Sequence, residues 1–181
     1  MKDPTLEEMQ EFSARLNELI NNEKYVEAKK MLSEEFEIYP EEYFLVSMLS
    51  EVSLYLHEYS AALSYSEEAV RLCDTDFLVI FNYAWALVSN KKYREALKWC
   101  NKINSTRASV IAMDSEGARW ARALKYDASY LTAVCHFHIG EKEKAVKELY
   151  FLLKKNLFKG CCPHFKKEEI EKTIEEFKKK M

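Results

Sequence analysis

The chain has 181 residues and a formal net charge of −3 at pH 7, with acidic and basic side chains interspersed along its length. This pattern provides no basic field of the kind that nucleic acid or an anionic lipid surface needs, so we expect neither as a partner. Only three Gly and three Pro are present, which leaves little material for tight turns and hairpins. The composition therefore predicts an all-α protein.

The first residues contain no apolar stretch of signal-peptide type, and no run of about 18 apolar residues occurs anywhere. We therefore expect a cytoplasmic protein that does not insert into a membrane. Five cysteines, an odd number, fit reduced thiols better than a disulfide framework.

Apolar side chains recur every three or four residues along the chain, and turn residues divide this pattern into antiparallel helix pairs. The predicted pairs cover approximately residues 9–42, 43–76, 77–105 and 126–156. An insertion over 106–125 interrupts the spacing, and a helical pattern from Ser115 to Ile139 predicts that it lengthens the first helix of the fourth pair. A last helix over 164–181 has one apolar stripe and charged outer faces, which is typical of a helix that closes off a solenoid.

A short phrase recurs at fixed distances. Tyr25, Tyr59 and Tyr93 each stand three residues before an alanine, and the alanines Ala28, Ala62 and Ala96 are 34 residues apart. A further copy, with Gly140 and Ala145, follows after one period and the insertion. A period of this length indicates a repeat architecture.

These residues, together with Ala69, Pro40 and Ala133, resemble the tetratricopeptide repeat, a helix-turn-helix unit of about 34 residues. The resemblance extends from about Phe12 to Leu153. It implies one domain over 1–181, a right-handed α-α superhelix of about four helix pairs plus a C-terminal capping helix. In similar proteins the first helices of the pairs line a concave groove that holds an extended or helical segment of a protein partner.

The resemblance also assigns residues to that groove. The assigned positions are Phe44, Ser47, Glu51, Tyr55, Leu78, Phe81, Trp85, Tyr130, Val134, Phe137 and His138. This surface is aromatic and apolar, although the aromatic residues could instead be core contacts. Family members that grip the acidic C-terminus of chaperones use basic residues and asparagines there. Only Asn17 and Asn82 are present here, so we set that function aside.

The leading functional hypothesis is a protein-interaction scaffold or adaptor whose groove binds an apolar peptide or an amphipathic helix. The alternative is a dedicated chaperone or assembly subunit that shields a partner protein. We expect no enzyme, no catalytic residue and no cofactor. The sequence Cys161-Cys162-Pro163-His164 lacks the second spaced pair of ligands that a zinc site needs, so we expect no metal. The sequence specifies no oligomeric state.

The insertion has two interpretations. Its apolar residues, Trp120 among them, either fold over the groove edge near Trp85 and Tyr130 or pack on the C-terminal helix. The second arrangement would bury Trp120 on Ile170 or Phe177.

Overall fold

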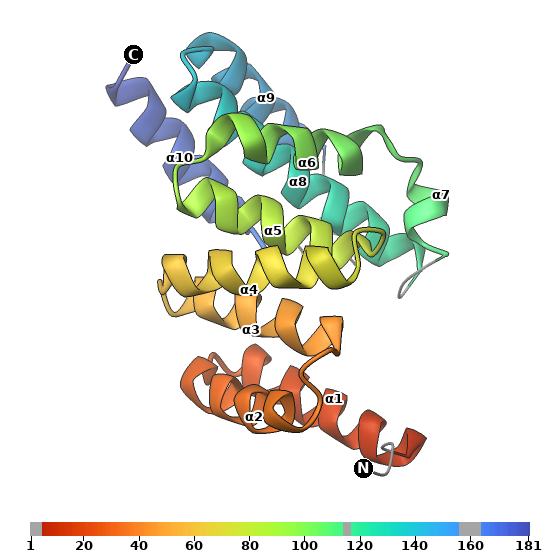
Figure 1. Cartoon of the computed structure of the whole chain (residues 1–181). Helices are drawn as coiled ribbons and strands as arrows, with labels where there is room; N and C mark the ends of the chain where they lie inside the picture. Colours follow the sequence, from red (N-terminus) through yellow and green to blue (C-terminus); the bar gives the residue numbers. More distant parts are fainter. Residues whose placement is uncertain (1–4, 114–116, 156–163) are drawn as a thin grey trace.

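The computed structural model describes residues 5–113, 117–155 and 164–181, and these residues form ten helices and no strand. The helices are α1 (Leu6–Asn21), α2 (Tyr25–Ile38), α3 (Tyr43–Tyr55), α4 (Tyr59–Leu72), α5 (Phe77–Ser89), α6 (Tyr93–Ser105), α7 (Ala108–Ile111), α8 (Ala118–His138), α9 (Lys142–Lys154) and α10 (Lys167–Lys179). Four antiparallel pairs stack from the N-terminus to the C-terminus, and α10 closes the stack (Figure 1). The predicted all-α solenoid with four pairs and a capping helix is confirmed.

The turn inside each pair has the same backbone geometry. Glu23, His57, Lys91 and Gly140 all have positive φ, from 57° to 101°. The amide that follows each of these residues donates to the carbonyl five residues earlier, as Lys24 does to Leu19 at 2.9 Å. This is the Schellman ending of a helix, which reverses the chain directly into the next one. Only one of the four positions is glycine, so the pairing depends on the periodic context as well as on residue type.

The anchoring alanines lie where helices cross at close range. Ala28, Ala62, Ala96 and Ala145 have no exposed surface. A small side chain at this position allows the second helix of each pair to approach its neighbours closely, and this explains why alanine recurs in the first turn of each second helix.

The insertion adds the short helix α7 and extra turns at the start of α8, so the predicted lengthening of that helix is confirmed. Ile111 is fully buried in a cluster that α5, α6 and α8 form, and Trp120 packs against the same cluster. Ile170 and Phe177 belong to a different cluster, which α8, α9 and α10 share. The segment that lies against Trp85 and Tyr130 is the one that precedes α10.

Candidate functional site

The eleven residues assigned to the concave groove come from the first helices of three successive pairs. Helix α3 carries Phe44, Ser47, Glu51 and Tyr55; α5 carries Leu78, Phe81 and Trp85; and α8 carries Tyr130, Val134, Phe137 and His138. Their surroundings differ along the groove, and three parts can be distinguished.

The middle part holds a segment of the chain itself, His164 and Phe165. The His164 ring stacks on Phe81 at 5.1 Å between ring centroids, and its Nδ1 lies 2.9 Å from the hydroxyl oxygen of Tyr55. Phe165 is almost fully buried and meets Trp85 edge-on at 5.2 Å and Tyr130 at 4.4 Å. The aromatic groove residues therefore surround an aromatic dipeptide from a distant part of the sequence.

Asp127 on α8 holds the backbone of this dipeptide. Its carboxylate accepts the amide N–H of His164 at 2.9 Å and that of Phe165 at 3.1 Å. Burial raises the pKa of Asp127 to about 6, against the opposing effects of His164 and the two amide donors. Glu51 adds a second buried carboxylate, 3.9 Å from His164 Nδ1. The middle part thus combines an aromatic surface with one carboxylate that accepts two backbone amides and a second that lies beside the His164 ring.

The C-terminal part of the groove is covered by α10. Phe137 stacks on Phe177 at 3.7 Å, and the Tyr130 hydroxyl lies 2.9 Å from Thr173 Oγ1. His138 stacks on Tyr93 at 4.3 Å. An amphipathic helix of the chain therefore occupies this part.

At the N-terminal part the assigned residues pack within the stack. Phe44 and Leu78 are partly buried against the cluster of α1, α2 and α3. Ser47 is buried and accepts a hydrogen bond from Asn82 Nδ2 at 3.0 Å. Asn82, one of the two asparagines considered for a carboxylate clamp, is thus fully buried and engaged with its neighbour.

The repeat register also places Asp127 on the groove face, because it has the same spacing before its anchoring alanine, Ala145, as Phe44 has before Ala62. What the sequence did not predict is the dipeptide that Asp127 holds. His164 and Phe165 lie outside every repeat, and no periodic signal points to them.

Two of the three cysteines among the described residues are held in the core. Cys100 and Cys135 are buried, and burial raises the pKa of both thiols, that of Cys135 to about 12. Thiols in such surroundings are inert. Cys161, Cys162 and Pro163 lie outside the described residues, and the ring of His164 is engaged in the groove.

Within residues 5–113, 117–155 and 164–181, no group of three or more His, Cys, Asp or Glu side chains is arranged to hold a metal ion. None of the helices in the same ranges combines the length and the apolar character that crossing a membrane requires.

Comparison with known proteins identifies the fold. The arrangement of helix pairs is that of a tetratricopeptide-like helical repeat protein. The structure of MamA 41-end from Desulfovibrio magneticus RS-1 superimposes with a TM-score of 0.56 at 14% identity, over 95% of this chain and 96% of that one. A MamA RS-1 ArsTM double mutant has a TM-score of 0.55 at 14% identity, over 94% of both chains. No protein-family model matches the sequence, and no curated protein matches it.

Proposed function

We propose that this chain is a protein-interaction scaffold whose concave groove binds an apolar peptide or the apolar face of an amphipathic helix. The observation that carries the proposal is the dipeptide His164–Phe165, which lies on the aromatic residues of α3, α5 and α8. A peptide from a partner would use the same contacts. Its aromatic side chain would fill the space between Trp85 and Tyr130, and its backbone amides would donate to Asp127.

The position of α10 supports the second type of ligand. This helix has an apolar stripe of Ile170, Ile174 and Phe177, and the stripe packs on α8 and α9. The same surface would accommodate an amphipathic helix of similar pattern.

A partner must displace the chain's own segment. The segment belongs to the same chain, so it competes for the groove as an intramolecular ligand. A partner peptide therefore binds the wild-type chain less tightly than its contacts alone would allow, and binding is coupled to release of His164 and Phe165.

The test uses a peptide with the sequence of residues 163–174 and the full chain with His164→Ala and Phe165→Ala. Fluorescence anisotropy should show that the labelled peptide binds this double variant at least about tenfold more tightly than the wild type, since the variant lacks the competing side chains. A control peptide with the same two alanines should bind neither chain. The proposal fails if the double variant retains its helical circular dichroism but does not bind the peptide.

Natural partners can be sought with the same pair of chains. Proteins recovered from native cell extract by the double variant, and less by the wild type, are candidates for groove ligands. A stoichiometric partner that aggregates when this chain is removed would favour the alternative, a dedicated chaperone or assembly subunit.

A further inference from the structure

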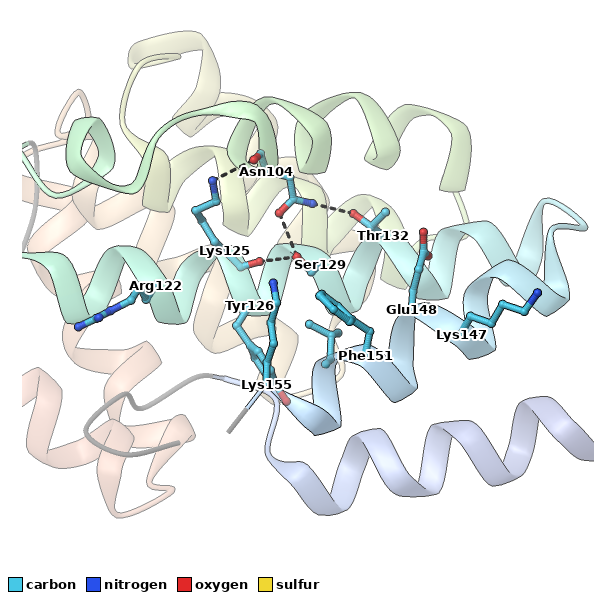
Figure 2. Close-up of a pocket in the computed structure, with 11 residues that line it drawn as sticks. Asn104, Arg122, Lys125, Tyr126, Ser129, Thr132, Lys147, Glu148, Phe151 and Lys155 are labelled. Carbon is cyan, nitrogen blue, oxygen red and sulfur yellow. Dashed lines mark hydrogen bonds between the residues drawn. The ribbon is translucent and has the colours of Figure 1, made fainter. Parts of the chain in front are cut away.

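A second hollow lies on a different face of α8 from the groove. It is an open cavity of about 940 Å³ between the end of α6, the middle of α8 and the outer face of α9 (Figure 2). The cavity is large enough for several residues of a peptide or for a drug-sized ligand.

The charge of this cavity is opposite to that of the chain. Four cationic side chains line it, Arg122, Lys125, Lys147 and Lys155, and Glu148 is the single acidic residue in the lining. Glu148 is already engaged, because its Oε2 lies 2.7 Å from His136 Nδ1. Within the described part of the chain, no carboxylate forms an ion pair with Arg122, Lys147 or Lys155. A protein with net charge −3 thus concentrates uncompensated positive charge at one site.

Lys125 is held at the rim by the end of α6. Its Nζ donates to the carbonyl of Asn104 at 2.9 Å (Figure 2). It also donates to the carbonyl of Thr106, and both are carbonyls that a helix C-terminus leaves free. Burial, and then the neighbouring charge of Lys155, lower the pKa of Lys125. Two ammonium groups are therefore close enough to repel each other, and a bound anion would relieve that repulsion.

The outer face of α9 combines charge with an apolar residue. Lys147, Phe151 and Lys155 succeed one another at intervals of four residues, so they share one face, and the two lysines are about 12 Å apart along the helix axis. Phe151 keeps 57% of its surface exposed, and Lys155 Nζ lies 4.5 Å from its ring centroid. An exposed aromatic side chain flanked by two cations that have no carboxylate partner among the described residues is the arrangement of an interface anchor rather than of a solvated surface.

A hollow at the N-terminal end of the stack, between α2 and the turn that joins α3 to α4, is different. It is smaller, about 380 Å³, and its lysines have partners: Lys29 pairs with Glu58, and Lys30 with Glu34 at 3.8 Å. The lysines of this hollow are thus paired with carboxylates, whereas the cations of the cavity beside α9 are not.

We propose that the cavity between α6, α8 and α9 binds an acidic peptide segment in which an apolar side chain is flanked by carboxylates. The apolar side chain packs on Phe151, and the carboxylates meet Lys147 on one side and Lys155 with Arg122 on the other. This site is separate from the concave groove and does not depend on the function proposed for the groove.

The probe is an array of 12-residue peptides in which Leu, Phe or Trp is flanked by acidic, neutral or basic residues. The full chain should retain the acidic peptides selectively. For the best of them, anisotropy should show binding weakened by about tenfold or more with Lys147→Glu plus Lys155→Glu, because two attractions become repulsions. Phe151→Ala should weaken binding several-fold. Two controls should retain binding. Lys98→Glu plus Lys172→Glu makes the same change in net charge elsewhere on the surface, and Tyr150→Ala removes another exposed aromatic ring.

Several outcomes would overturn the proposal. One is an array without preference for Asp and Glu, and another is equal weakening by the pocket variants and their controls. Displacement of the peptide by millimolar inorganic phosphate would assign the cavity to small anions instead. Tighter binding of a single-stranded oligonucleotide than of any peptide would assign it to nucleic acid. The groove variant His164→Ala plus Phe165→Ala should bind the acidic peptide as the wild type does, which keeps this test distinct from that of the groove.

Discussion

The two hollows on either side of α8 differ in whether their side chains have partners within the chain. On the concave side, Asp127 and Tyr130 contact the chain's own residues, and the aromatic surface is buried within the molecule. On the other side, Lys147 and Lys155 have no ionic partner within the described residues, and Phe151 remains exposed. The comparison shows that one helix can complete the core with one face and leave a binding surface on another. Apolar area on the first face contributes to stability, whereas charge on the second contributes to recognition.

The largest expected effect on stability comes from removing one phenylalanine ring from the groove, and the matched comparison removes one from the basic cavity. Phe165→Ala should lower the free energy of unfolding by about 3 kcal/mol, because a buried ring between Trp85 and Tyr130 is replaced by a cavity. Phe151→Ala should change it by less than about 0.5 kcal/mol, because that ring is mostly exposed. Urea denaturation of the two variants measures both values. Equal losses would break the distinction between a structural and a free surface.

The groove should also respond to pH. The pKa of Asp127 is about 6 in the folded chain and about 3.9 when unfolded, so the folded state binds the extra proton between these values. This contribution to stability is fully present below about pH 4 and is lost as the pH rises through about 6, with a total of about 3 kcal/mol.

The measurement is the free energy of unfolding of the wild type and of Asp127→Asn at intervals from pH 4 to 8. The side-chain amide of the variant Asp127→Asn cannot titrate, so the wild type should lose up to about 3 kcal/mol of stability relative to this variant as the pH rises from 4 to 8. Glu175→Gln, which removes an exposed carboxylate on α10, controls for net charge. A difference that stays constant across the range would mean that Asp127 does not titrate there.

A smaller effect is expected from the hydroxyl group of Tyr55. Tyr55→Phe removes the 2.9 Å contact with His164 Nδ1 and should cost about 1 kcal/mol, a typical net value for one hydrogen bond. Tyr150→Phe removes a hydroxyl that accepts a hydrogen bond from the Lys178 ammonium on the exposed side of α9, and it should cost less than about 0.5 kcal/mol because water replaces that partner. Thermal denaturation of both variants tests this, and a larger loss from Tyr150→Phe would contradict the comparison.

The smallest effect on stability is expected at the basic cavity. Lys155→Gln should change the free energy of unfolding by less than about 0.5 kcal/mol, as is usual for an exposed side chain. It should also raise the pKa of Lys125, because the repelling charge is removed. Denaturation and NMR titration of the lysine amines check the two statements. A loss above about 1 kcal/mol would show that the cations of the cavity are structural.

Much of the fold could be predicted because its determinants are local. The spacing of Tyr25, Tyr59 and Tyr93 from their alanines identified the turns, and the structure has the all-α stack of helix pairs that the apolar period predicted. Helix periodicity and turn geometry act over a few residues, so they are visible in the order of residues alone. The same register assigned aromatic residues to the inner face of the stack, and their use by a partner remains a prediction.

The tertiary structure decided what fills that face and where the free charge gathers. His164 meets Tyr55 across 109 positions of the sequence, and no local pattern specifies such a contact. The basic cavity likewise depends on packing, because Lys125 comes from α8 and Lys147 from α9, while the carbonyls that hold Lys125 end α6. In the sequence each of these lysines has an acidic residue nearby, Asp127 or Glu148, so the charges give no net signal. Only the stacking of the helices separates the cations from the acids, since it orients each helix face toward a different neighbour.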